Sequence, residues 1–481
     1  MKKIKINYLT IFGDFFCWLV TYLAIFLLLM AIWLFNKDKM FSIEGTLILS
    51  RVSILFLAIG LYLLYRETRK KITTVSLVCI SFYLFQMGQY FVYAIEPNNE
   101  KLFFKSSYYC AFFGNDFFLL NICVIVTLVG FAFFNLGQLC YIKLSSRKNS
   151  SIKIHYKKSE TFSTILMLIL IVSTIISIHY VIRDIQISFS STYTEFIQSS
   201  PFGGVSTFYI FIAPSILGIY VFSDKKIYKL IATFIGIIYF SLRFMIGGRT
   251  LSVGFFVTLL LYYFIEVKKK KIKLSTIIII ITIIYFAASF LVCMHNIRIL
   301  SDKNIMTIIA NFINIVFSGT AIKSIIIEFG YNASSLPWSI VNLSSCFFGK
   351  TYLASLSGLI PSSLDIFHWF SEYRMYASLD AKLGASLNMG YGPGMSMIAE
   401  AFLNCKCLFF LPMFLFGLMF TKLSSFDLNQ KKNSFLYYLQ LASFSTILIM
   451  PRRPFFYLVT TELYIGILIY IIYMIFRRKH I

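Results

Sequence analysis

The side chains best suited to chemistry are ionisable groups that lie inside or beside long apolar stretches of the sequence. They are Arg51, Arg243, Arg249, Glu400, Arg452, Arg453 and Glu462. Such a group costs several kcal/mol in hydrocarbon unless it is paired or hydrated, so it marks a candidate functional site. Arginine carries a permanent charge on a planar group that binds two phosphate oxygens at once, a geometry that lysine lacks. The arginines therefore predict a site for a phosphate-bearing ligand; the alternative is that some only extend to the interface from span ends.

A second pattern covers residues 390–404. Its first five residues include three glycines and one proline, which permit a sharp turn and a close approach of the backbone to a ligand. If a helix begins near Met395, then Ser396, Glu400 and Asn404 recur at i, i+4 and i+8 and form one polar stripe on an apolar helix. That stripe must face protein or water. It predicts either a functional site or contacts with neighbouring helices, including a pair between Glu400 and a buried arginine.

Residues 295–394 interrupt the apolar pattern and predict one large loop on one side of a membrane. Residues 305–329 have helical periodicity, which predicts a surface helix or a re-entrant helix. The rest mixes aromatic and polar side chains, a combination that suits carbohydrate because sugar faces stack on aromatic rings. These side chains are Tyr352, His368, Trp369, Tyr373, Arg374, Tyr376, Asn388 and Tyr391. The alternative is that they form an interfacial aromatic belt and the core of the loop.

The composition is that of a polytopic membrane protein. The 481 residues are 58% hydrophobic and 13% charged, with a mean hydropathy of +0.79, and apolar runs long enough to span a bilayer recur throughout. The net charge of +24 lies in short lysine clusters between these runs. The positive-inside rule explains such clusters, so we expect no nucleic-acid partner. The nine cysteines lack metal-ligand spacing, and whether Cys110 and Cys346 pair in outward loops is left open.

The charge pattern predicts an all-α polytopic membrane protein with about twelve transmembrane helices and both termini in the cytoplasm. The first apolar run, up to residue 35, is too long for a removable signal peptide. The large loop at about 295–394 separates the ninth span from the tenth, which covers residues 395–420, and residues 1–481 form a single integral membrane domain. On this topology Asp14 lies toward the cytoplasmic side, where we expect it to reach the nearby interface.

The depth of the charges argues against a transporter. A transporter concentrates charges near the membrane midplane, on discontinuous helices in two related halves. Here the intramembrane charges lie in the outer third of the predicted spans, and the outer segments are rich in arginine while the inner loops are rich in lysine. This distribution predicts a site at the outer surface of the membrane.

Three features together resemble the Wzy-type oligosaccharide repeat-unit polymerases, which build O-antigen and capsule. They are the Gly-Gly-Arg-Thr hairpin within residues 244–250, the late outward loop, and the Gly-Pro-Gly segment that leads into the polar stripe of residues 390–404. The resemblance implies a multi-pass glycosyltransferase of the bacterial plasma (inner) membrane. It also implies a polyprenyl-pyrophosphate-linked oligosaccharide as substrate, within the lipid bilayer. A chain-length regulator and a flippase are implied as possible partners.

This chemistry gives the basic residues a role. Departure of a pyrophosphate needs positive charge, so Arg249 and Arg298 are expected to clamp it, with Arg374, Arg452 and Arg453 as further candidates. The outer segments contain no Asp-x-Asp metal motif, so we expect a metal-independent enzyme without a cofactor.

The acceptor hydroxyl needs a base. Glu400 is the leading candidate because its depth places it near the arginines, and its rivals are His368, Asp365 and Glu372. Further substrate contacts are expected from Arg243, Ser396, Asn404 and Tyr391.

Two other function classes stay open: a flippase or transporter of lipid-linked oligosaccharide, and a non-catalytic scaffold for polysaccharide assembly. A polymerase predicts that Arg249→Ala, Arg298→Ala and Glu400→Gln each give surface glycan with a single repeat unit. A flippase would tolerate Glu400→Gln, and a scaffold would tolerate the loss of any single outward arginine.

Overall fold

The structure, a computed structural model, describes residues 8–34, 41–69, 71–97, 116–146, 159–190, 204–246, 249–268, 274–299, 305–341, 347–359, 369–377, 379–386, 394–427, 434–463, 465–466 and 469–477. Every regular element in these ranges is helical. Cys110 and Cys346 fall outside the described residues.

The first half of the chain forms long helices. They are α1 (Tyr8–Leu34), α2 (Ile43–Glu67), α3 (Thr74–Ile95), α6 (Phe117–Ser146), α7 (Glu160–Ser190), η2 (Gly204–Phe211), α9 (Ile212–Phe222), α10 (Lys226–Ile246), α11 (Arg249–Tyr262), η3 (Tyr263–Lys268) and α12 (Leu274–Ile299). The hairpin predicted near Arg249 is present as the break between α10 and α11.

The second half forms shorter helices. They are α13 (Ile305–Ser318), α14 (Ala321–Gly330), η4 (Tyr331–Ser334), α15 (Ser335–Val341), α16 (Lys350–Ala354), η5 (Ser355–Leu359), α17 (Ser371–Ala377), α18 (Leu379–Ser386), α19 (Met397–Cys405), η7 (Lys406–Leu408), α20 (Phe410–Ser424), α21 (Ser434–Ile449), η8 (Met450–Arg452), α22 (Phe455–Leu463) and α23 (Ile469–Arg477).

Within the described residues, five helices are long and apolar enough to cross a membrane. They are Ile43–Glu67, Thr74–Ile95, Phe117–Ser145, Glu160–Ile187 and Lys226–Phe244. A sixth candidate is the pair Met306–Ser318 and Ala321–Val341, which is bent by 96°. Five further apolar helices are shorter: Gly13–Leu27, Phe208–Phe222, Ser252–Ile265, Ile281–Cys293 and Phe410–Ser424. The described part of the protein is therefore all-helical with five to six candidate spans, and the prediction of about twelve spans stays a prediction.

One predicted span, residues 395–420, is not a continuous helix. It divides into α19 and α20, and Lys406 between them has a positive φ of 49°. A residue with positive φ cannot continue a right-handed α-helix, and hydropathy does not detect such a break because its flanks are equally apolar.

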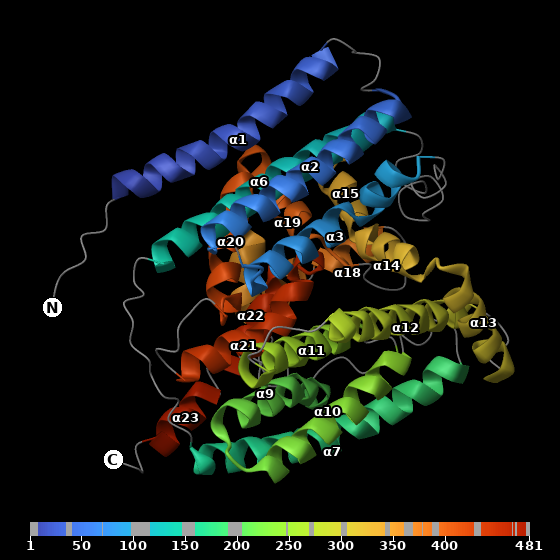
Figure 1. Cartoon of the computed structure of the whole chain (residues 1–481), viewed down its shortest axis with the longest axis vertical. Helices are drawn as coiled ribbons and strands as arrows, with labels where there is room; N and C mark the ends of the chain where they lie inside the picture. The colour runs from blue at the N-terminus through green and yellow to red at the C-terminus, as the bar shows by residue number, and fades with distance from the viewer. Residues whose placement is uncertain are drawn as a thin grey trace.

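The helices form two groups with the C-terminal helices between them (Figure 1). Helices α1, α2, α3 and α6 lie along one side, and α7 and α9 to α12 lie along the other. Between them α20 packs on α6, while α21 packs on α9 and α11. The C-terminal segment, which carries Glu400, Arg452 and Arg453, therefore lies inside the molecule with helices on both sides.

The contact between α6 and α20 depends on two glycines. A Cβ atom on Gly137 would collide with the carbonyl oxygen of Phe414, and one on Gly417 would collide with the carbonyl oxygen of Phe134. Small residues at a helix crossing let the two backbones approach closely, which is how helices associate where hydrophobic burial adds little. This crossing fixes the position of α20 against α6, and α19 packs on α20.

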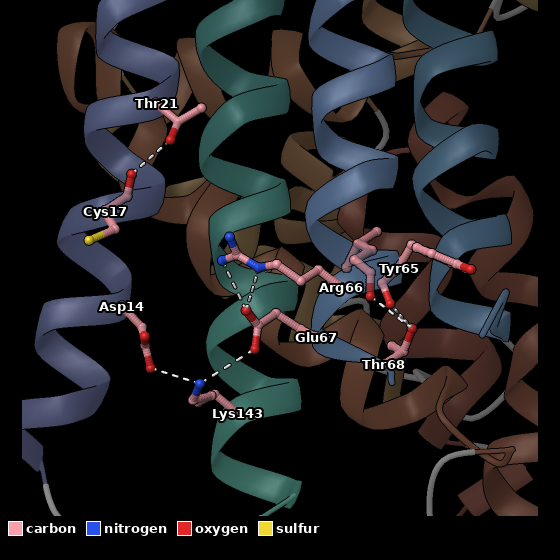
Figure 2. Close-up of polar contacts among 9 residues, drawn as sticks. Asp14, Cys17, Thr21, Tyr65, Arg66, Glu67, Thr68 and Lys143 are labelled. Atoms are coloured by element: carbon pink, nitrogen blue, oxygen red, sulfur yellow. Dashed lines mark hydrogen bonds and ion pairs between the residues drawn. The ribbon is translucent and has the colours of Figure 1, made fainter. Parts of the chain in front are cut away.

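A small ionic network ties α1 to the bundle (Figure 2). The Lys143 Nζ on α6 lies 2.8 Å from the Asp14 Oδ2 on α1 and 3.5 Å from the Glu67 Oε2 on α2. The guanidinium of Arg66 also pairs with Glu67 at 3.1 Å. Asp14 is thus an ion-paired residue near the start of α1, and this pair gives it a structural role.

Candidate active site

The polar stripe predicted after Gly394 lies on α19 and faces protein. Ser396 is the N-cap of the helix, and its Oγ accepts a 3.1 Å hydrogen bond from the Ala399 N–H. The Ser396 N–H donates to the Oγ of Ser335 at the start of α15. Ser396, Glu400 and Asn404 are all buried, so the stripe contacts other parts of the protein and not solvent.

The carboxylate of Glu400 has 0% of its surface exposed and accepts hydrogen bonds at both oxygens. The Thr351 hydroxyl on α16 donates to Oε1 at 2.8 Å, and the Phe455 N–H at the start of α22 donates to Oε2 at 2.7 Å. Asn404 completes the group by donating to the Thr351 Oγ1 at 2.6 Å. A buried carboxylate needs such donors. Glu400 thereby connects α19 to two elements that are distant in sequence.

We use the term arginine turn for Pro451, Arg452, Arg453 and Pro454, the segment just before α22. Gln86 on α3 donates through Nε2 to the Pro451 carbonyl at 2.6 Å, and Asn332 on η4 donates through Nδ2 to the Arg452 carbonyl at 2.8 Å. With the bond from the Phe455 N–H to Glu400, three side chains bind the backbone on both sides of the two arginines. Sequence reasoning missed Gln86 and Asn332, because amides in apolar helices occur for many reasons.

Gly394 brings the two sequence motifs together. It has a φ of +93°, and a Cβ atom there would lie 3.1 Å from the Asn332 Nδ2 and 3.5 Å from the Arg452 carbonyl oxygen. The backbone of Gly394 therefore approaches the amide that binds the arginine turn, and the predicted approach to a ligand stays a prediction.

The two arginine side chains of the turn lie against aromatic rings and are partly exposed. The Arg453 guanidinium carbon is 4.7 Å from the centre of the Tyr457 ring, and that of Arg452 is 5.8 Å from the Phe85 ring. Such contacts hold a guanidinium in place while it keeps its charge.

Tyr457 connects the turn to α18. It donates through its hydroxyl to the Asp380 Oδ2 at 3.4 Å. Arg243, predicted to contact the substrate, lies over the ring of Tyr209 on η2, with 5.0 Å between the guanidinium carbon and the ring centre. The substrate contact of Arg243 stays a prediction.

Several predicted site residues are not covered by the side-chain description. Arg249 is the first residue of α11 and Arg298 lies in α12, but their side chains are outside the described set, as is that of Glu372. His368, Asp365 and Tyr391 fall outside the described residues altogether. Arg374 lies on α17 and is half-buried. The roles predicted for these residues stay predictions.

The aromatic residues of the large loop divide into two kinds. Tyr352 is partly buried and packs on the rings of Phe416 on α20 and Phe455 on α22, so it belongs to the edge of the hydrophobic core. Trp369 and Tyr373 are exposed, at 71% and 58%. Exposed aromatic rings on one short segment suit stacking on sugar faces. The packing of Tyr352 agrees instead with the alternative prediction that some of these rings have a role in packing.

Lys382 on α18 lies between two aromatic rings, with its Nζ 4.1 Å from the centre of the Tyr376 ring and 5.6 Å from that of Phe347. Burial there lowers the pKa of the ammonium below its ordinary value. Sequence reasoning missed this residue, because a lysine in a polar loop is usually solvated.

The described part of the chain holds no cluster of three or more His, Cys, Asp or Glu residues suited to a metal ion. Among the described side chains, Arg452 and Arg453 of the arginine turn lie next to Phe455, whose N–H binds the buried carboxylate of Glu400 on α19. Fixed cations of this kind stabilise a departing phosphate-type anion.

Comparison with known proteins identifies the family. No match was found among curated proteins or among solved structures. A family model described as O-antigen polysaccharide polymerase Wzy matches residues 18–480, which include every residue of the site described above. The chain therefore belongs to the Wzy family of O-antigen polysaccharide polymerases, membrane enzymes that polymerise oligosaccharide repeat units.

Proposed function

We propose that the chain performs this polymerisation on the outer side of the bacterial plasma membrane, and that the arginine turn binds the pyrophosphate of the lipid-linked donor. The observation that carries the proposal is the placement of Arg452 and Arg453 on a backbone segment bound by Gln86, Asn332 and Glu400. Arginines on a fixed segment present charge to an anion without a cost for ordering them.

The reaction requires one bond to break and one to form. The bond between the anomeric carbon of the growing chain and the pyrophosphate oxygen breaks, and its electrons leave with the polyprenyl pyrophosphate. The anomeric carbon bonds to an oxygen of the incoming unit, whose hydroxyl proton passes to a base. The arginines stabilise the leaving anion, and Arg249 and Arg298 are proposed to add to this charge from the start of α11 and from α12.

We assign the base to His368 in the large loop. Imidazole has a pKa near neutrality, which suits proton transfer at physiological pH. Glu400, the leading candidate from the sequence, already accepts hydrogen bonds from Thr351 and Phe455 at its two oxygens. Ser396 and Asn404 also bond to protein groups, so we propose that they support α19 rather than touch sugar.

The exposed aromatic residues are proposed to bind the glycan. Trp369 and Tyr373 offer rings for sugar faces, and Arg374 and Tyr391 are proposed to lie on the same substrate path. A chain-length regulator and a flippase are proposed as partners in the membrane.

The finer topology also belongs to this proposal: about twelve spans, to which the shorter apolar helices contribute, and a large outer loop at about 295–394 that contains α13 to α18. Residues 1–481 are proposed to form one membrane domain with both termini in the cytoplasm. Helix α1 begins and α23 ends on the same side of the molecule in Figure 1, which supports termini on one side of the membrane.

The test is the length of surface glycan in a strain that lacks the gene and carries a variant. Arg452→Ala and Arg453→Ala should each give glycan with a single repeat unit at normal abundance in the membrane. Arg66→Ala, which removes an arginine paired with Glu67 away from the site, is the matched control and should give long chains.

Two outcomes would contradict the proposal. Long chains from both arginine variants would remove the turn from the catalytic site. Absence of even single repeat units from the surface would indicate a flippase, because a polymerase defect leaves transport of the single unit intact.

A further inference from the structure

The backbone of the arginine turn is bound by side chains from three separate helical elements. Gln86 comes from α3, Asn332 from η4 and Glu400 from α19, and the three residues bond to Pro451, Arg452 and Phe455 respectively. All three side chains are buried. No two of them share a helix, so the turn is held from several directions at once.

These bonds fix the main chain and leave the charged ends of the side chains at the surface of the site. Arg452 and Arg453 are partly exposed and lie against Phe85 and Tyr457, while the carbonyls and N–H around them are engaged. Two neighbouring guanidiniums repel each other, and an unbound segment would separate them until a substrate anion arrived. Binding the backbone holds both cations in place beforehand.

We propose that Gln86, Asn332 and Glu400 are positioning residues for the polymerase reaction, which hold the arginine turn so that its two guanidiniums meet the donor pyrophosphate in one fixed geometry. The inference rests on the proposed function, because it requires the arginines to bind pyrophosphate. None of the three residues touches the reacting atoms. Their contribution is the preorganisation of charge.

The role assigned to Glu400 differs from that of a base in one measurable respect. A glutamine at this position keeps an oxygen that can accept the Phe455 N–H, so Glu400→Gln should retain polymerisation. Glu400→Ala removes the acceptor and leaves that N–H buried without a partner, and it should lose polymerisation. A catalytic base would lose activity in both variants.

The matched comparison uses two buried glutamines with the same kind of bond. Gln86 and Gln440 are each 1% exposed, and each donates through Nε2 to a main-chain carbonyl, of Pro451 at 2.6 Å and of Lys422 at 2.7 Å. Methionine replaces glutamine with similar volume and no donor. Gln86→Met and Gln440→Met therefore remove equivalent bonds, one at the arginine turn and one away from it.

The experiment uses the full-length protein in lipid nanodiscs with a lipid-linked repeat unit, and inorganic pyrophosphate as a competing probe. Gln86→Met should raise both KM and the inhibition constant of pyrophosphate roughly tenfold, the effect of losing one buried hydrogen bond. Gln440→Met should leave both constants unchanged. Asn332→Asp, which replaces the donor to Arg452 by a carboxylate oxygen, gives an independent test if Gln86→Met does not fold.

A double-mutant cycle completes the test. In an Arg452→Ala background, Gln86→Met should cause little further loss, because the group that it positions is gone. If the two losses add fully, or if Gln86→Met and Asn332→Asp both behave like the wild type, the positioning role is wrong. Wild-type activity of Arg452→Ala and Arg453→Ala would instead refute the proposed pyrophosphate site, so the two failures are distinguishable.

Discussion

The Asn332 side chain donates a 2.8 Å hydrogen bond to the carbonyl oxygen of Arg452, although 120 positions separate the two residues in the chain. Gly394 packs against the same amide. This contact joins η4, the Gly-Pro-Gly motif and the arginine turn. This contact and three other features of the structure have measurable effects on stability and activity.

Substitution of Gly394 should impair activity more than substitution of another glycine with positive φ. Alanine at a φ of +93° costs about 1–2 kcal/mol in the backbone, and its Cβ would also press on Asn332 and the Arg452 carbonyl. Gly319, with a φ of +68° and no atom within 4 Å of the added Cβ, is the control. Gly394→Ala should shorten surface glycan while Gly319→Ala does not; equal effects would mean that only backbone strain matters.

The crossing of α6 and α20 should tolerate no added methyl group. Gly417→Ala or Gly137→Ala forces the two backbones apart and should destabilise the protein by about 1–3 kcal/mol, as overpacking does. Gly13→Ala in α1, where nothing lies within 4 Å, is the matched control. Membrane abundance and thermal unfolding in detergent measure the difference. Normal abundance of Gly417→Ala would show that the crossing is looser than described.

Loss of Lys143 should loosen α1 as much as loss of Asp14. Lys143→Met and Asp14→Asn both break the ion pair that joins α6 to α1, and the second pair of Lys143 joins α6 to Glu67 on α2. The side chains are partly exposed, so each pair contributes about 0.2–1 kcal/mol. Limited proteolysis should cut near α1 faster in Lys143→Met than in Lys225→Met, which breaks the exposed pair with Glu160. Equal rates would leave α1 held by apolar contacts alone.

Lys382 should make stability depend on alkaline pH. Burial lowers its pKa in the folded protein below the ordinary value of 10.5, so the unfolded chain binds more protons between the two pKa values. Stability contributed by this group therefore rises as pH increases through that window and is lost below it. Thermal unfolding of Lys382→Met should lack this rise. The same slope in both proteins would assign it to another group.

The sequence predicted the local features of the site and missed what joins them. The stripe of Ser396, Glu400 and Asn404 follows from helical periodicity, and the structure confirms that it lies on a helix and faces protein. Its partners Thr351 and Phe455 lie 49 and 55 positions away. Periodicity describes one element at a time, so it cannot show which distant elements meet.

Hydropathy also does not show where an apolar stretch is interrupted. It recognises apolar composition, which α19 and α20 share, and it does not register the breaks at Lys406 or at Gly319. Both residues have positive φ, which is incompatible with a continuing right-handed α-helix. The all-helical class was confirmed because it needs only composition.

The difference in burial between the arginine turn and the exposed rings of Trp369 and Tyr373 has an evolutionary consequence. The backbone of the turn and of Phe455 is bound by three buried side chains, so changes to these three residues would disturb its position. Trp369 and Tyr373 project from the surface, where most replacements cost little stability. If the proposed function holds, recognition of a new sugar can therefore diverge rapidly at these two rings, while the proposed anchor for the lipid carrier changes slowly.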